Sequence, residues 1–180
     1  MAHPGETVHG DGDVVLRRWR AESDFDGLRR LIEGSLEHLR PWFEWVERYG
    51  DAHVRGFLER CEADWRGGVA YNWAIEAGGE LTGSCSLYRA EEPGGWHIGY
   101  WLHPGATGRG IASRAAAAMV DEAFGLAEVA YVEIVHDAAN GASGAVARRL
   151  GFVEVERLRV EPVAPGECGV DVVWRRVRAA

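Results

Sequence analysis

The most constraining stretch of the sequence is a glycine-rich loop that joins an apolar strand to a long alanine-rich helix. It reads Gly99-Tyr-Trp-Leu-His-Pro-Gly-Ala-Thr-Gly-Arg-Gly-Ile-Ala-Ser113 and continues to about Phe124. Gly108 and Gly110 allow a sharp turn and a close approach of the backbone to a ligand. A helix that begins near Gly110 presents free N–H groups and the positive end of its dipole. The stretch therefore predicts a site for a phosphate-bearing ligand.

The hydrophobic patterns around this loop predict an α/β fold with a mixed sheet. Strands are expected at about 14–20, 69–76, 81–88, 96–102, 128–135, 152–160 and 170–177. Helices are expected at about 24–35, 52–65, 110–124 and 140–150, with a shorter one that Pro41 begins. The strand over 128–135 follows a helix, so we expect it to run parallel to 96–102 in a βαβ unit. Residues 1–180 are expected to form a single domain, with 1–13 as a flexible terminus.

Composition excludes several classes of function. The formal net charge of −8 argues against nucleic acid as a partner, because phosphate backbones are bound by basic surfaces. No apolar run reaches the ~18–20 residues of a membrane span, and no signal peptide is expected. Three separated cysteines without a CxxC pair predict no metal site and fit a reducing, cytoplasmic location.

The loop alone does not define the phosphate ligand. Gly108-x-Gly110 resembles the start of a dinucleotide fingerprint, but Ser113 stands where the third glycine is expected. That fingerprint also opens its fold, whereas about a hundred residues precede this loop. No Gly-Lys-Ser or Gly-Lys-Thr follows, which excludes a P-loop. NAD and ATP are therefore disfavoured.

Five short motifs occur in a characteristic order along nearly the whole chain. They are His38-Leu-Arg-Pro-Trp42, Ile98-Gly-Tyr-Trp-Leu-His-Pro104, Thr107-Gly-Arg-Gly-Ile-Ala112, Asn140-x-x-Ser143-x-x-Val146 and Arg149-Leu-Gly-Phe152. The third resembles the Gln/Arg-x-x-Gly-x-Gly/Ala loop of the GNAT acyl-CoA N-acyltransferases. The others are similar to the RimJ/RimL branch, whose namesakes acetylate N-terminal amines of ribosomal proteins. The resemblance implies a GNAT-like sheet of about seven strands, splayed between 96–102 and 128–135.

The resemblance also implies that acetyl-CoA is the cosubstrate and that the glycine loop holds its pyrophosphate. The expected donor-binding residues are Tyr100, Leu102, Thr107, Gly108, Arg109, Gly110, Ile111, Ala112, Ser113 and Asn140. Pantetheine is expected to lie between the splayed strands and to pair with the backbone of Leu102. Asn140 is also a good helix N-cap, so both of its roles stay open. Thr107 replaces the usual Gln or Arg, which should weaken CoA binding only modestly.

Two catalytic residues follow from the same resemblance. Ser143 falls near the expected position of the CoA sulfur, where it could protonate the departing thiolate. Many relatives carry a Glu in Glu-x-Gly-Tyr, and His97 takes that place here. An imidazole titrates near ~6.5 and is a sound general base. A solvated helix serine and a half-buried strand histidine are the simpler interpretations of these two residues. Other candidates for the base are Glu44, Glu91, Glu92, Glu133 and Glu161.

The acceptor is expected to enter beside an unusually aromatic segment. Trp42, Phe43 and Trp45 are three aromatics in four residues and cannot all face inward from one short helix. The acceptor-binding candidates are Trp42, Phe43, Glu44, Trp45 and Tyr88. Acidic groups there would favour a cationic amine, either a protein N-terminus or a small molecule.

The sequence therefore predicts an N-acyltransferase that moves an acetyl group from acetyl-CoA to a primary amine by direct transfer in a ternary complex. Two alternatives stay open, namely a larger donor such as succinyl-CoA and a non-catalytic CoA-binding sensor or interaction module. The sequence also leaves a homodimer open.

Overall fold

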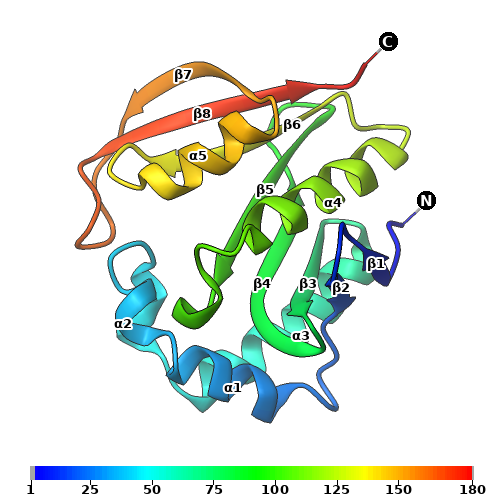
Figure 1. Ribbon diagram of the computed structural model, residues 1–180, viewed down its shortest axis with the longest axis vertical. Helices are drawn as coiled ribbons and strands as arrows, with labels where there is room; N and C mark the ends of the chain where they lie inside the picture. Colours follow the sequence, from blue (N-terminus) through cyan, green and yellow to red (C-terminus); the bar gives the residue numbers. More distant parts are fainter. Residues whose placement is uncertain (1–2, 180) are drawn as a thin grey trace.

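The computed structural model describes residues 3–179, and its centre is a sheet of eight strands in the order β1-β2-β3-β4-β5-β6-β8-β7 (Figure 1). The strands are β1 (Thr7–His9), β2 (Val14–Arg18), β3 (Ala70–Ala77), β4 (Glu80–Arg89), β5 (Gly95–Leu102), β6 (Tyr131–Asp137), β7 (Val153–Arg159) and β8 (Val170–Val177). The helices are α1 (Phe25–Glu33), α2 (Leu36–Leu39), α3 (Asp51–Gly67), α4 (Ile111–Gly125) and α5 (Gly141–Arg149), with short 3-10 turns η1 (Glu44–Arg48) and η2 (Pro104–Ala106). The mixed α/β fold is confirmed, with one strand more than expected.

Helices cover both faces of the sheet, with α4 and α5 in front of it and α3 behind it in Figure 1. Helix α4 is rich in alanine, the strongest helix former. Its buried Ala115, Ala116 and Met119 belong to the main core cluster, which also contains Trp73 and Ile98. Small side chains let this helix lie close to the sheet, which fixes the loop that precedes it.

The opposite face has a second, smaller core. Leu58 and Cys61 of α3 pack with Leu28 of α1, with Trp19 after β2 and with Ala74 of β3. Trp19 is fully buried, and its indole N–H donates to Ser84 Oγ at 3.1 Å. This second core anchors the helices that precede the aromatic segment.

The amino-terminal segment differs from the expectation of a flexible end. Residues 7–9 form β1, which pairs antiparallel with β2. The backbone N–H of Gly5 donates to Glu122 Oε2 at 2.7 Å, and that of Arg18 donates to the carbonyl of Glu6 at 2.7 Å. Residues 3–13 thus include a paired strand, because backbone pairing needs little apolar content; residues 1–2 lie outside the described part.

The aromatic segment also differs from expectation, because Pro41 does not begin a helix. Helix α2 ends at Leu39, whose carbonyl accepts the backbone N–H groups of Trp42 and Phe43 at 2.9 and 3.0 Å. Phe43 is extended, and the 3-10 turn η1 follows. Trp42 and Phe43 therefore lie on a tight turn between two short helices, which directs their side chains differently from that of Trp45.

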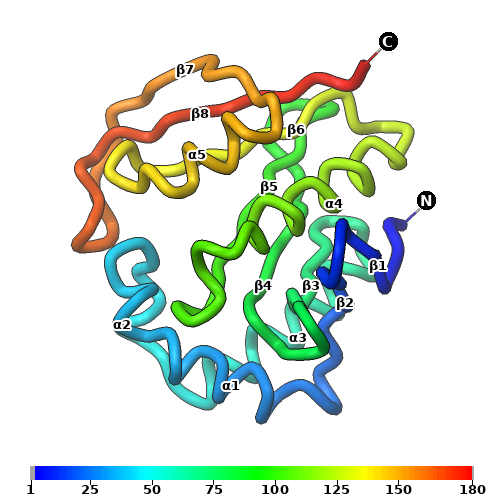
Figure 2. The backbone as a smooth tube through the Cα atoms, in the orientation of Figure 1, coloured from blue at the N-terminus to red at the C-terminus, as the bar shows by residue number. Residues whose placement is uncertain are grey.

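The loop between β7 and β8 lies beside this turn (Figure 2). The backbone N–H of Gly166 donates to the carbonyl of Pro41 at 2.9 Å. The loop is held at its other end by the buried carboxylate of Asp137, which accepts backbone N–H groups of Cys168, Gly169 and Val170. The turn after α2 is thus attached to the far end of the sheet.

No helix within residues 3–179 combines the length and the apolar character that crossing a membrane requires.

Candidate active site

The sheet opens between its two parallel strands. β5 pairs with β6 only from Gly95 to His97, opposite Tyr131 to Glu133. On its other side β5 stays paired with β4 as far as Leu102. The β6-facing edge of β5 from Ile98 to Leu102 therefore has no described strand opposite it. The splay expected between these strands is confirmed.

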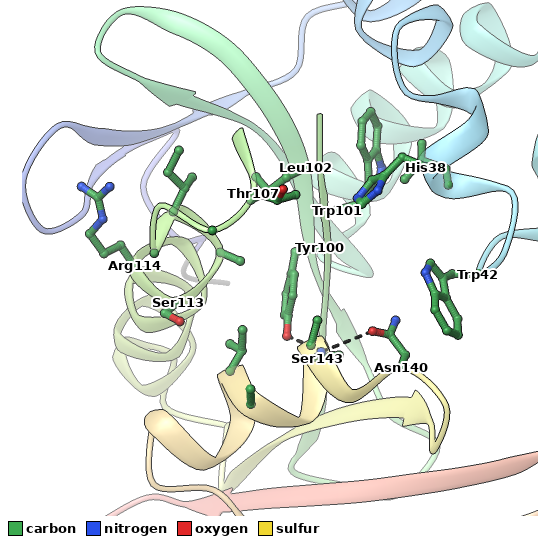
Figure 3. Close-up of a pocket in the computed structure, with 18 of the residues that line it drawn as sticks. His38, Trp42, Tyr100, Trp101, Leu102, Thr107, Ser113, Arg114, Asn140 and Ser143 are labelled. Atoms are coloured by element: carbon green, nitrogen blue, oxygen red, sulfur yellow. Dashed lines mark hydrogen bonds between the residues drawn. The ribbon is translucent and has the colours of Figure 1, made fainter. Parts of the chain in front are cut away.

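A cavity of about 790 Å³ occupies this opening. Its lining comes from β5, the glycine loop, α4, α5 and the turn after α2 (Figure 3). The lining residues are His38, Leu39, Trp42, Phe43, Tyr100, Trp101, Leu102, Thr107, Gly108, Gly110, Ile111, Ala112, Ser113, Arg114, Asn140, Ala142, Ser143, Ala145, Val146 and Arg149. The cavity therefore brings most of the expected donor-binding residues together with two of the expected acceptor residues.

The glycine loop forms one end of the cavity. Gly108 and Gly110 have φ of +72° and +71°, a conformation that other residues rarely adopt. A Cβ at either position would meet no protein atom within 4 Å, so both face open space. Helix α4 begins directly after Gly110, and its first backbone N–H groups lack partners within the helix. The loop is therefore shaped to accept an anionic group.

Two arginines that the sequence argument did not select line this end of the cavity, whereas Arg109 does not. Arg114 pairs with Asp13 at 2.7 Å. Arg149 donates to Ser113 Oγ at 2.6 Å. Ser143, Val146 and Arg149 are spaced three residues apart, which places their side chains on one face of α5. That periodicity is the sequence signal that could have identified Arg149.

The middle of the cavity holds a pair of hydroxyl groups. The Tyr100 hydroxyl, from β5, lies 3.1 Å from Ser143 Oγ on α5 (Figure 3). Asn140 is the N-cap of α5 and accepts the backbone N–H of Ser143 at 3.3 Å, as the capping interpretation predicts. Burial raises the pKa of Tyr100, and the hydrogen bond with Ser143 lowers it by less. Tyr100 is therefore a neutral phenol at physiological pH.

His97 does not line the cavity and lies on the paired part of β5, three residues before Tyr100. Three residues of strand correspond to about 10 Å. Its side chain packs against Tyr88, with ring centroids 5.2 Å apart. His97 Nδ1 is buried without a hydrogen bond and lies 3.7 Å from Glu133 Oε2. Glu133 is buried and also pairs with Arg175 at 2.7 Å, so a protonated His97 would have a carboxylate partner.

The expected acceptor residues separate into two groups. Trp42 and Phe43 line the cavity, together with His38 and Trp101, which the sequence argument did not select. The other three, Glu44, Trp45 and Tyr88, do not line it. Glu44 is exposed and pairs with Arg48 at 3.0 Å. Trp45 stacks on His53 with centroids 5.0 Å apart. Tyr88 lines a different, smaller cavity beside α3.

Within residues 3–179, no group of three His, Cys, Asp or Glu side chains is placed to hold a metal ion. The lining of the cavity offers hydroxyl groups, backbone N–H groups and arginines. These groups suit an anionic ligand and proton transfer.

The opening between β5 and β6 and the glycine loop before α4 share one cavity, which suits a phosphate-bearing ligand. The chain belongs to the GNAT acetyltransferase family, because the family model described as the acetyltransferase (GNAT) domain matches residues 13–153. It is therefore an acyl-CoA-dependent N-acetyltransferase. The chain is 31% identical over 141 residues to YdaF of Bacillus subtilis (strain 168), to which a ribosomal N-acetyltransferase function is ascribed. The match covers 76% of each chain.

Two solved structures have the same fold. Mycobacterium smegmatis RimJ, in complex with a CoA disulfide, is 26% identical with a TM-score of 0.85, covering 98% of this chain and 90% of that one. RimL, the ribosomal L7/L12 alpha-N-protein acetyltransferase in complex with CoA, is 23% identical with a TM-score of 0.87. That match covers 96% of this chain and 98% of RimL and supports the fold. The RimJ/RimL resemblance expected from the motifs is confirmed.

Proposed function

We propose that this enzyme acetylates the α-amine of a protein N-terminus by direct transfer from acetyl-CoA. One observation carries the proposal: a single cavity runs from the glycine loop, past the Tyr100–Ser143 pair, to Trp42 and Phe43. Direct transfer requires donor and acceptor in one space, with the reacting atoms side by side. YdaF and RimL, described above, support a ribosomal protein as the source of that N-terminus.

In this proposal the pyrophosphate of acetyl-CoA lies on the backbone N–H groups of 108–112, where Gly108 and Gly110 leave open space. Ser113 and Arg149 supply a hydroxyl and a cation beside it. Pantetheine runs along the edge of β5 that has no strand opposite it and adds to Leu102 like a further strand. Asn140 lies near this arm at the start of α5.

The position of His97 favours an α-amine over a lysine side chain as the acceptor. An α-amine has a pKa of about 7.7–8.0, so roughly a tenth to a sixth of it is neutral at pH 7. A lysine amine, with a pKa of about 10.4, is neutral in only about one molecule in 2,500. His97 lies outside the cavity lining, so in this proposal it accepts the proton of the amine through water. A distant base of this kind is adequate for an amine that is already partly neutral.

The experiment that tests this function follows release of free CoA thiol from acetyl-CoA with three acceptors. These are a peptide with a free N-terminus and no lysine, the same peptide N-blocked with one lysine, and a panel of small amines. We expect release with the first peptide and at least tenfold less with the second, as the fraction of neutral amine requires. Release with a small amine alone would establish the small-molecule alternative. CoA-dependent thermal stabilisation without thiol release would establish the sensor.

His97→Ala tests the assignment of the base. We expect kcat at pH 7 to fall by roughly ten- to a hundredfold, the lower range for general-base catalysis of a partly neutral amine. The acidic limb of the pH profile of kcat/KM should change as well. Glu133→Gln should also lower kcat, because it removes the carboxylate that lies 3.7 Å from His97 Nδ1. An unchanged rate and pH profile in His97→Ala would show that His97 is not the base.

A further inference from the structure

The hydroxyl groups of Tyr100 and Ser143 lie in contact in the middle of the cavity. We propose that Tyr100 is a positioning residue that supplies, through Ser143, the proton taken up by the departing CoA thiolate. This inference rests on the proposed function. It gives Tyr100 a role in proton transfer in addition to lining the donor site.

The geometry fixes the two hydroxyl groups relative to each other. Tyr100 comes from the part of β5 where β6 has diverged, so its ring crosses the opening and reaches α5. Ser143 is held from behind, because its backbone N–H is engaged by Asn140. Within residues 3–179, the Tyr100 hydroxyl hydrogen-bonds with Ser143. Both side chains line the cavity.

Hydrogen-bond capacity sets the direction of the relay. A serine hydroxyl has one donor and can accept at the same time. If the Ser143 proton points to the sulfur, its oxygen is free to accept the proton of Tyr100. A phenol is a donor with an unperturbed pKa of about 10. Burial raises the pKa of Tyr100 further and keeps the phenol protonated before the reaction.

The chemistry explains why serine alone is a poor acid. Its alkoxide is far more basic than a thiolate, whose thiol has a pKa of about 8.5 in cysteine. A phenol is closer to that value, so it is the better matched source of the proton. Ser143 without Tyr100 would have to hold most of a negative charge in a half-apolar cavity.

The proposed step is balanced in atoms and electrons. The amine nitrogen attacks the thioester carbon, and the carbonyl reforms as the C–S bond breaks with its electron pair going to sulfur. Sulfur takes the proton of Ser143 Oγ while Ser143 takes that of Tyr100. The new amide nitrogen then loses one proton to solvent, and the Tyr100 phenolate recovers one from solvent. The products are the amide and CoA thiol.

Kinetics of Tyr100→Phe, Ser143→Ala and the double variant test the relay. We expect Tyr100→Phe to lower kcat by roughly ten- to a hundredfold, with the KM for acetyl-CoA within about twofold. The double variant should be no slower than Ser143→Ala within about twofold, because both changes interrupt one path. Tyr131→Phe, which removes only an exposed contact with Glu92, is the matched control. Additive losses in the double variant would overturn the relay, as would an unchanged kcat in Tyr100→Phe.

A second measurement does not depend on the acceptor. The ultraviolet absorbance of the thiolate reports the pKa of the CoA thiol in its complex with the protein, with desulfo-CoA as the blank. Hydroxyl groups that donate to sulfur favour the thiolate, so Tyr100→Phe should raise this pKa. If the wild-type protein transfers acetyl groups but the variant changes neither kcat nor this titration, the relay is wrong and the proposed function stands. If the wild-type protein neither binds CoA nor releases thiol, the proposed function itself fails.

Discussion

The two walls of the cavity are built in different ways. The donor wall consists of β5, the glycine loop, α4 and α5, which lie within one stretch of chain from Gly95 to Arg149. The acceptor wall is the turn at 38–43. The loop at 162–169 supports this turn through the hydrogen bond from Gly166 to Pro41. One wall follows from local sequence, and the other depends on contacts between distant segments.

Under the proposed function each wall contacts a different substrate, so the difference bears on specificity. The donor wall offers backbone N–H groups at positive-φ glycines, which suit any phosphate of the same shape. The acceptor wall offers side chains held by a turn and a loop, whose positions change when either segment changes. We therefore expect a fixed donor preference, and an acceptor preference that depends on a few side chains.

Gly110→Glu is the most severe test of the donor wall. A Cβ at this position points into open space, so the glutamate would place its bulk and charge where the pyrophosphate is expected. The positive φ adds strain. We expect CoA affinity to fall by more than about a hundredfold, as loss of backbone phosphate contacts together with repulsion implies. Calorimetric titration with CoA measures it.

Gly125→Glu is the matched control for that substitution. It adds the same charge at the other end of α4, where a Cβ also meets nothing within 4 Å. Its CoA affinity should stay within about twofold of the wild type, because screened charges at this distance contribute little. Retained CoA affinity in Gly110→Glu would refute the assignment of the glycine loop.

Trp42→Ala tests the acceptor wall and should have a smaller effect. Trp42 lines the cavity, so its removal should raise the KM for the acceptor peptide by roughly tenfold, the effect of losing about 1–2 kcal/mol of apolar contact. The affinity for CoA should not change.

Trp45→Ala is the contrasting variant, because Trp45 packs on His53 and Trp101. It should lower the melting temperature and leave the acceptor KM of the folded enzyme nearly unchanged. If Trp45→Ala raised the acceptor KM and Trp42→Ala only lowered the melting temperature, Trp45 rather than Trp42 would be the residue that contacts the acceptor.

The same contrast explains how much the sequence could predict. The glycine loop, the βαβ unit and the helix face with Asn140 and Ser143 are local patterns, and the structure contains each of them. Adjacency to Trp42 makes Glu44 and Trp45 candidates for acceptor binding, but a tight turn after Leu39 directs their side chains away from the cavity. The turn depends on hydrogen bonds that no periodicity encodes.

Other differences also arise from long-range contacts. The pairing of β1 with β2 depends on a sheet edge that sequence composition does not reveal. Trp101 lines the cavity because the sheet opens beside it, although alternation along β5 marks it only as a strand residue. The contact of Tyr100 with Ser143 joins two motifs that were each recognisable, but their distance of 3.1 Å follows only from the fold.

Asp137→Asn should have the smallest effect on activity and a distinct effect on stability. The buried Asp137 carboxylate accepts backbone N–H groups from Ala139, before α5, and from Cys168 to Val170, at the start of β8. The asparagine side chain would place its NH2 group, a donor, against backbone N–H groups that are also donors. We expect the free energy of unfolding at pH 7 to fall by about 1.5–3 kcal/mol, the range for hydrogen bonds to a charged group. The acceptor KM should rise a few-fold as the loop at 162–169 loosens.

The effect of Asp137→Asn should depend on pH in a predictable direction. Burial would raise the pKa of Asp137, but the backbone hydrogen bonds outweigh it and hold the pKa well below its usual range. A depressed pKa in the folded state stabilises the protein above the unfolded value of about 3.9, and this contribution is lost as the pH falls further. The difference in unfolding free energy between wild type and variant should therefore be largest above about pH 5 and should shrink below about pH 4. Urea unfolding across this range measures it, with the exposed Asp121→Asn as control. A difference that stays constant with pH would show that the carboxylate's charge does not hold the loop.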